Sequence, residues 1–198
     1  MAVAKDVADK SGGKFNVAGT EAKHEESALV EAARAVAVTS PQGVLLVGSP
    51  KFMADALRAL RLAGARQFVF ALSYLSADLA IKVAGLEHAR GLGIAQAFLN
   101  PNGVAMALQR NFKAAMNAFD PKIARLGAFH LEGYVSAYVL VEALKRAGAN
   151  PDAASVSKAL RQLGDIDVGG FRVNFAQSNE GSRFVDVGVV SGSGSLIY

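Results

Sequence analysis

The chain has no cysteine, only three histidines among 198 residues, and no apolar run long enough to span a bilayer. Without thiols it can form neither disulfides nor thiolate metal sites, and a cysteine nucleophile is excluded. The opening segment, MAVAKDVADKSGGKF, carries charges where a signal peptide would carry its apolar core. We therefore expect no export signal in the sequence as written, which fits either a cytoplasmic protein or a chain whose natural N-terminus lies upstream.

Motifs for catalysis, metal binding and nucleic-acid binding are also missing. The net charge is only +4, and the basic residues are dispersed rather than gathered in a stripe. His24, His88 and His130 lack the spacing of a metal site, and the glutamates beside His24 suggest the start of a helix. The sequence contains neither a G-x-S-x-G elbow nor a P-loop. We expect no enzyme, no cofactor and no metal.

The apolar segments predict an α/β fold, since 52% of the residues are hydrophobic and strand-like and helix-like runs alternate in the first half. The strand at 44–48 is continuously apolar, which is typical of a parallel strand buried on both faces. Right-handed crossovers would join the strands into a parallel sheet. Strands are expected at 15–18, 44–48, 66–73 and 89–98, and helices at 27–38, 49–64 and 77–83.

The pattern changes after LNPNG, which ends at Gly103 and is typical of a turn or linker. Helices then follow one another at 104–119, 131–147 and 153–163, and a last strand is expected at 183–192. Between them lies GDIDVGGFRVNF, which predicts a glycine turn between alternating strands. Asp165 and Asp167 could form a carboxylate pair, but beside glycines they are better explained as acceptors for the turn backbone.

Three residues form a candidate small-molecule site. Ser49 and Ser73 each follow a predicted buried strand and precede a helix, and Tyr74 is adjacent. In open parallel sheets, ligands bind beyond the carboxyl ends of the strands, where hydroxyl groups can donate and accept hydrogen bonds. The alternative for each serine is that it caps the following helix.

The order of four segments resembles a known family. These segments are SPQGVLLVGSPKFMADALRALRLAGARQFVFALSYLSAD, ARGLGIAQAFLNPN, LEGYVSAYVLVEALKRAG and LGDIDVGGFRVNFAQSNEGSRFVDVGVV. Together they resemble the later half of the type 1 periplasmic solute-binding proteins of the branched-chain amino acid group, the receptors of ABC importers. The resemblance runs from about Val7 to the end of the chain.

The resemblance implies two α/β lobes joined by crossover strands, with the ligand held in the cleft between them. Residues 1–99 would form most of the second lobe, a parallel-sheet three-layer lobe, and 100–103 a crossover. Residues 104–183 would form a helical segment and hairpin of the first lobe, and 184–198 the final crossover strand. The rest of the first lobe and the opening strand of the second would lie outside this sequence.

The resemblance also implies a function without catalysis: solute binding in the periplasm for an ABC permease. The ligand would be a branched-chain amino acid or a related small solute such as an amide or a small acid. Many receptors of this family place an acidic residue after the strand matched by QFVFAL, whereas this chain has Leu72, Ser73 and Tyr74 there. The alternatives are a ligand-sensing regulator or receptor domain of the same fold, or a fragment that binds nothing; an enzyme ranks last.

A partial lobe should leave apolar helix faces without a covering layer. The face formed by Leu131, Val135, Tyr138 and Val139 is one such candidate. Each buried aliphatic side chain contributes roughly 1.5–3 kcal/mol, so a face of this kind favours association. We therefore expect the chain to self-associate.

Overall fold

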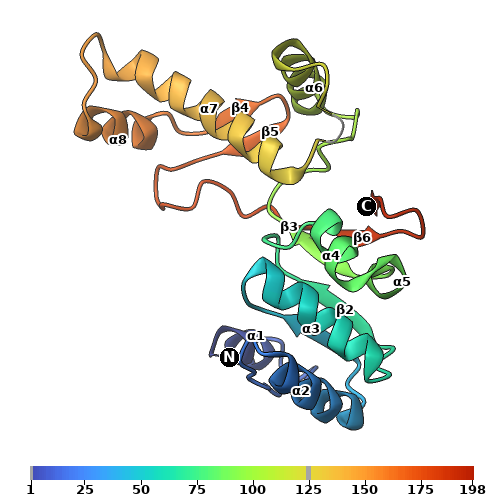
Figure 1. Cartoon of the computed structure of the whole chain (residues 1–198). Coiled ribbons are helices and arrows are strands. Elements are labelled where there is room, and N and C mark those ends of the chain that lie inside the picture. The colour runs from blue at the N-terminus through green and yellow to red at the C-terminus, as the bar shows by residue number, and fades with distance from the viewer. Residues whose placement is uncertain (1, 124–125) are drawn as a thin grey trace. The chain divides into compact units, whose positions relative to one another are not determined.

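The computed structural model describes residues 2–123 and 126–198, so Met1, the expected first residue of the second lobe, lies outside the described residues. The chain forms two compact units (Figure 1). Unit 1 comprises Met1–Leu92 with Val190–Ser195, and unit 2 comprises Gly93–Val189 with Leu196–Tyr198. Within the described ranges no helix is both long and apolar enough to cross a membrane.

Unit 1 is built on a parallel strand pair, as the sequence predicted. Strands β1 and β2 align from Gly43 opposite Phe68 to Leu46 opposite Ala71. Helix α3 packs between α2 and α4, and these helices lie side by side in Figure 1. The elements are α1 (Ala2–Lys10), α2 (Glu26–Thr39), β1 (Gly43–Leu46), α3 (Pro50–Leu62), β2 (Phe68–Ala71), α4 (Ala77–Ala84) and α5 (Leu86–Ala89).

The two strands are buried on one face only, which corrects the expectation of burial on both. Leu46, Val69 and Ala71 are buried, whereas Leu45 is 55% exposed and Phe68 is 71% exposed. The burial therefore alternates with the period of two expected for a half-covered sheet. The second face stays open because no element of the described chain covers it.

Helix α3 contributes many of the buried side chains of unit 1. It begins at Pro50, whose missing N–H is harmless at that position, and its apolar stripe buries Met53 and Leu57. At its end the guanidinium of Arg61 donates to the carbonyl oxygens of Ala65 (2.8 Å) and Gln67 (3.0 Å). Burial lowers the pKa of Arg61 from its ordinary value. Arg61 thereby fixes the turn that leads from α3 into β2.

Unit 2 contains the helix-rich second half of the chain. Strand β6 lies between β3 and β7, and its pairing with β3 is antiparallel, with Ile94 opposite Gly188. The elements are β3 (Gly93–Gln96), α6 (Ala107–Phe119), α7 (Ala128–Ala147), α8 (Ala153–Gln162), β4 (Ile166–Val168), β5 (Phe171–Val173), β6 (Asp186–Val190) and β7 (Leu196–Ile197).

The expected glycine turn is present between β4 and β5, which pair antiparallel. The carboxylate of Asp167 accepts a 2.6 Å hydrogen bond from the Gly170 N–H, and Asp165 accepts one of 2.7 Å from the Asn174 amide. The expectation of a backbone acceptor is confirmed for Asp167, whereas Asp165 accepts from the side-chain amide of Asn174 instead. The Gly169 carbonyl accepts from the Leu108 N–H at 2.9 Å, which links the hairpin to the start of α6.

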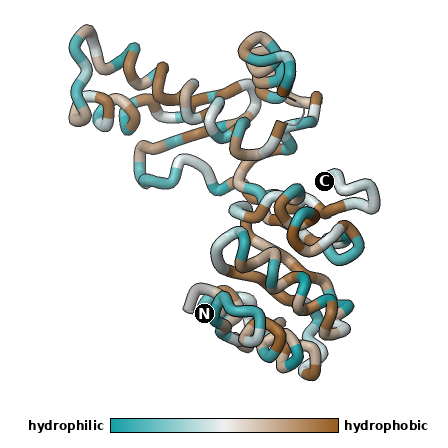
Figure 2. Tube along the Cα trace, viewed as in Figure 1, coloured by the Kyte–Doolittle hydropathy of each residue, from teal (hydrophilic) through white to brown (hydrophobic). Residues whose placement is uncertain are grey.

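The core of unit 2 forms between α6, α7 and this hairpin. Hydrophobic stretches recur along α7 in Figure 2, and the residues of α7 that belong to the core cluster are buried. The cluster consists of Leu108, Phe112, Leu131, Val135, Val139, Ile166, Val168, Phe171 and Val173.

Two further expectations from the sequence are wrong. No strand forms at 15–18, where the chain has no regular structure and Phe15 is 46% exposed. The α7 face expected to be open is mostly buried, since Leu131, Val135 and Val139 pack in the core and only Tyr138 is exposed. The hairpin covers that face of α7 because the alternating residues of β4 and β5 point toward it.

Candidate functional site

The predicted site lies at the carboxyl edge of the parallel pair in unit 1. Leu46 and Ala71, the last residues of β1 and β2, are in register. Ser49 follows three residues after the first strand, and Ser73 two residues after the second. Because the strands are parallel, both serines leave the sheet at the same edge, where ligands of open α/β sheets bind.

The two serines are in different local structures. The Ser49 hydroxyl oxygen accepts a 3.3 Å hydrogen bond from the Phe52 N–H and so caps α3. Ser73 does not cap a helix: it lies in the turn closed by the Leu75 N–H and the Leu72 carbonyl at 3.1 Å. Ser76 caps α4 instead, by accepting from the Leu79 N–H at 3.1 Å. The capping alternative therefore accounts for Ser49 but not for Ser73.

The capping bond does not use every hydrogen-bonding position of the Ser49 hydroxyl. A serine hydroxyl has one donor and two acceptor positions, and the cap occupies one acceptor position. Its O–H can still donate to a carbonyl or carboxylate oxygen of a ligand. Tyr74, at 60% exposure, adds an aromatic ring and a phenol beside Ser73.

An aromatic side chain that the sequence analysis did not single out lies against the loop after β1. A Cβ built on Gly48 would lie 2.5 Å from Cδ1 of Phe52, so the ring of Phe52 rests directly on this glycine. The ring of His24 meets the ring of Phe52 edge-on, with centroids 5.6 Å apart. A glycine four residues before an aromatic residue is a weak signal, and the contact with His24 could not be read from the sequence.

His24 also contacts a pair of oppositely charged side chains on α3. Its Nε2 lies 2.8 Å from Oδ2 of Asp55, and the ammonium of Lys51 lies 2.7 Å from the same oxygen. Burial raises the pKa of Asp55, but the hydrogen bonds with His24 and Lys51 outweigh it and hold the pKa below its ordinary value of 3.8. The helix start suggested by the glutamates beside His24 is confirmed, since α2 begins at Glu26. The N-cap residue Glu25 makes no side-chain cap bond, and the ring of His24 reaches across to α3.

The chemistry of this edge suits binding. The loops at Gly48–Ser49 and Leu72–Leu75 carry hydroxyls and aromatic or aliphatic groups but no carboxylate. The described residues contain no group of three or more metal-ligating side chains. His130 lies in the first turn of α7, where its Nδ1 accepts from the Gly127 N–H at 3.1 Å.

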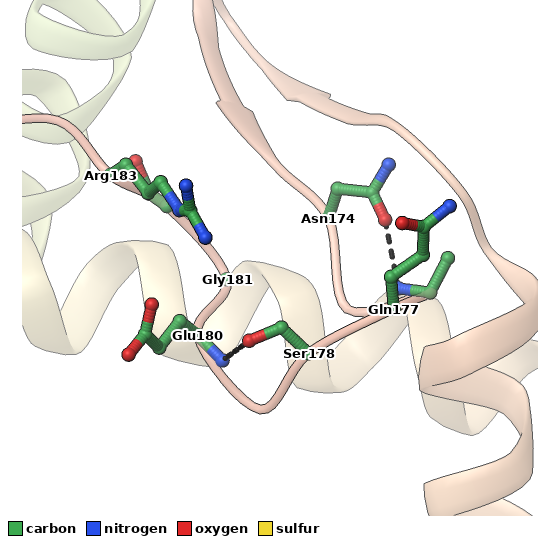
Figure 3. A pocket seen from close by; sticks show the side chains of 8 residues that line it. Asn174, Gln177, Ser178, Glu180, Gly181 and Arg183 are labelled. Atoms are coloured by element: carbon green, nitrogen blue, oxygen red, sulfur yellow. Dashed lines mark hydrogen bonds between the residues drawn. The ribbon is translucent and has the colours of Figure 1, made fainter.

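Unit 2 has a depression of about 440 Å³ within the loop after β5 (Figure 3). Its polar side chains mostly serve the loop itself: Asn174 accepts from the Ala176 N–H and Ser178 from the Glu180 N–H, both at 2.8 Å. The depression therefore reflects the path of one loop and not a set of converging ligand contacts. It is lined by Asn174, Ala176, Gln177, Ser178, Glu180, Gly181, Ser182 and Arg183.

Comparison with known proteins decides the family. The sequence profile of the periplasmic binding proteins matches residues 1–192. The chain belongs to the periplasmic binding protein family. This agrees with the resemblance drawn from the four sequence segments and with the parallel strands of unit 1.

Solved structures of related proteins cover most or all of the chain. An extracellular ligand-binding receptor from Verminephrobacter eiseniae is 40% identical, with a TM-score of 0.92 over 100% of this chain and 56% of its own. A substrate-binding periplasmic protein from Ralstonia solanacearum is 35% identical, with a TM-score of 0.70 over 79% of this chain and 45% of its own. The chain thus spans about half the length of these relatives.

A more distant structure shares the fold alone. A leucine binding protein from Thermotoga maritima is 20% identical, with a TM-score of 0.76 over 98% of this chain and 53% of its own. No curated protein sequence matches the chain.

Proposed function

We propose that this chain is part of a solute-binding protein whose ligand contacts the carboxyl edge of β1 and β2. The observation that carries the proposal is the register of the two strands, which brings Ser49 and Ser73 to one edge. Ser49, Ser73 and Tyr74 are the proposed contacts. The function is binding, and the proposal includes no catalytic step.

The proposed ligand is a branched-chain amino acid or a related small polar solute, such as an amide or a small acid. The hydroxyls of Ser49 and Ser73 suit a carbonyl or carboxylate oxygen, which every member of this class carries. An ammonium group would find no carboxylate in the loops at Gly48–Ser49 and Leu72–Leu75. We therefore propose that this edge recognises the hydrogen-bond acceptors of the ligand, its carbonyl or carboxylate oxygens.

For the whole protein we propose a periplasmic location and delivery of the solute to the permease of an ABC importer. The support is membership of the periplasmic binding protein family, together with the resemblance to the branched-chain amino acid group. We also propose that the chain self-associates, because large apolar side chains are open to solvent on the sheet of unit 1.

The test is a titration of the isotope-labelled chain with leucine, valine, acetamide and acetate. The backbone amide signals in NMR spectra report the binding. We expect shifts concentrated at residues 48–49 and 72–75, with saturation in at least one titration. A lost neutral hydrogen bond is worth roughly 0.5–1.5 kcal/mol, so Ser73→Ala should weaken binding about 2- to 10-fold.

Matched variants separate binding from folding. Ser49→Thr keeps the capping oxygen and adds a methyl group at the site, so it should weaken binding without loss of helix α3. Ser157→Ala, on the exposed surface of α8, is the control and should bind like the wild type. Shifts that avoid both loops, or equal binding by all variants, would overturn the assignment of the site.

A further inference from the structure

Phe52 contacts the loop of the proposed ligand contact Ser49 in two ways. A Cβ on Gly48, the residue before this serine, would meet Cδ1 of the Phe52 ring at 2.5 Å and Cε1 and Cγ at 3.1 Å. The ring therefore packs on the loop at a distance that only a glycine allows. The Phe52 N–H also donates to the hydroxyl oxygen of Ser49 at 3.3 Å. The ring thus fixes the residue before the serine, and the backbone fixes the serine itself.

The Phe52 ring is in turn held by His24, which comes from the segment before α2. The two rings meet edge to face, with an interplanar angle of 82°, an arrangement that aromatic pairs prefer. The Nε2 of His24 lies 2.8 Å from Oδ2 of Asp55, three residues after Phe52 on the same face of α3. His24 is therefore attached to α3 at two points, which fixes both the position and the orientation of its ring.

The carboxylate of Asp55 is a firm anchor for this histidine. The ammonium of Lys51 lies 2.7 Å from the Asp55 oxygen that His24 contacts, so two side chains hold one carboxylate oxygen. The Asp55 side chain is 23% exposed, which places the cluster at the partly covered start of α3. The chain of contacts runs from Asp55 through His24 and Phe52 to the loop of Ser49.

Core packing does not account for the position of Phe52. The ring is half-buried, and Phe52 does not belong to the buried stripe by which α3 packs into unit 1. That stripe consists of Met53, Ala54, Ala56, Leu57, Ala59 and Leu60. Loss of the ring should therefore leave the core of unit 1 in place and act on the loop at Gly48–Ser49.

We propose that Phe52 is a positioning residue for the Ser49 hydroxyl and that His24 acts on this hydroxyl through the Phe52 ring. The effect on binding rests on the proposed function, in which Ser49 contacts the ligand. Without the ring, Gly48 regains the wide backbone freedom of a glycine, and the hydroxyl of Ser49 samples several orientations. Ligand binding would then have to order the loop, which lowers the affinity about 2- to 10-fold.

The titration of the whole chain with leucine, valine, acetamide and acetate, repeated on variants, tests this effect. Phe52→Leu should weaken binding about 2- to 10-fold for each solute that the wild type binds. Leu57→Val is the matched control, because it shortens a buried side chain of the same helix without contact to Gly48 and should bind like the wild type. Unchanged affinity in Phe52→Leu, or an equal loss in Leu57→Val, would overturn the proposal.

A double-mutant cycle tests whether His24 acts through Phe52. His24→Ala should weaken binding in the wild-type background, because the Phe52 ring loses its edge-on partner. In the Phe52→Leu background the same substitution should have no further effect, since the ring that transmits it is absent. Additive losses would show that His24 affects the ligand by another route and would reject this part of the proposal.

NMR spectra of the free protein supply a readout that needs no ligand. The couplings between the α and β protons of Ser49 should indicate a single side-chain rotamer in the wild type and an average over rotamers in Phe52→Leu. The α-proton signals of Gly48 should also lose the ring-current shift caused by Phe52. Averaged couplings in the wild type, or unchanged couplings in Phe52→Leu, would contradict the positioning of Ser49. If the wild type binds none of the solutes, the proposed function fails, and these couplings alone decide whether Phe52 orients Ser49.

Discussion

Replacement of Gly169 by alanine should destabilise the chain through two separate effects. Gly169 has φ +67°, in the left-handed region that disfavours residues with a Cβ. An added Cβ would also lie 2.5 Å from the backbone nitrogen of Leu108. That nitrogen donates to the Gly169 carbonyl at 2.9 Å, so the hairpin and α6 would have to move apart where they are joined.

The magnitude can be worked out with a matched glycine. Gly164 has a similar φ of +63°, but an added Cβ there meets nothing within 4 Å. Gly164→Ala should therefore cost only the backbone strain, roughly 1–2 kcal/mol of unfolding free energy. Gly169→Ala should cost the same strain and in addition about 1–3 kcal/mol, because the Leu108 N–H loses its buried acceptor.

Urea denaturation followed by circular dichroism measures both free energies on the same chain. We expect Gly169→Ala to unfold at clearly lower urea, with a difference between the two variants of at least about 1 kcal/mol. Gly164→Ala serves as the control for the positive φ alone. Equal destabilisation by the two substitutions would refute the reasoning, because the close approach to α6 would then contribute nothing.

Three further predictions concern unit 1 and β3. The hydrogen bonds to Asp55 lower its pKa below 3.8, so the stability that they contribute should be complete above pH 3.8 and be lost as the pH falls through the lowered pKa. In urea titrations at different pH values, Asp55→Asn should therefore reduce the fall in unfolding free energy on the acid side. Gln96 is 4% exposed and its Oε1 has no hydrogen-bond partner among the described residues, so Gln96→Met should raise the free energy of unfolding by roughly 1–2 kcal/mol. A lower free energy of unfolding for this variant would show that the amide oxygen does have a partner. Ser76→Ala should lower the melting temperature through loss of a cap worth about 1 kcal/mol, whereas Ser73→Ala should leave it nearly unchanged; equal losses would mean that Ser73 also supports the turn.

Local patterns were sufficient for most helices and for the hairpin. The start of α3 is encoded by Ser49 and Pro50, and the turn of the hairpin by Asp167 and the following glycines, because each signal acts within a few residues. The parallel pairing of β1 with β2 could also be predicted, since short apolar runs separated by a helix leave few alternative topologies. The assignment of residues 1–99 and 104–183 to two lobes stays a prediction.

The burial of a surface by residues distant in the sequence could not be predicted in the same way. The segment VLLV has the composition of a strand buried on both faces, yet Leu45 is exposed, because composition does not say whether a second layer of helices is present. Val135 and Val139 show the opposite error, since the hairpin that covers them follows more than twenty residues later in the chain. Segment 15–18 has β-forming residues, but a strand forms only where a neighbour supplies the ladder.

The same limit applies to the site. Sequence alone could place Ser49 and Ser73 at one edge of a sheet, because that follows from the order of strands and helices. It could not distinguish the capping serine from the turn serine, since Ser76 offers an equivalent hydroxyl three residues later and helix α4 uses that one. Ser73 is thus the hydroxyl that no cap requires, whereas Ser49 has to hold α3 while it donates to a ligand. If the site works as proposed, alanine at position 73 should affect binding alone, and alanine at position 49 should affect binding and helix stability together.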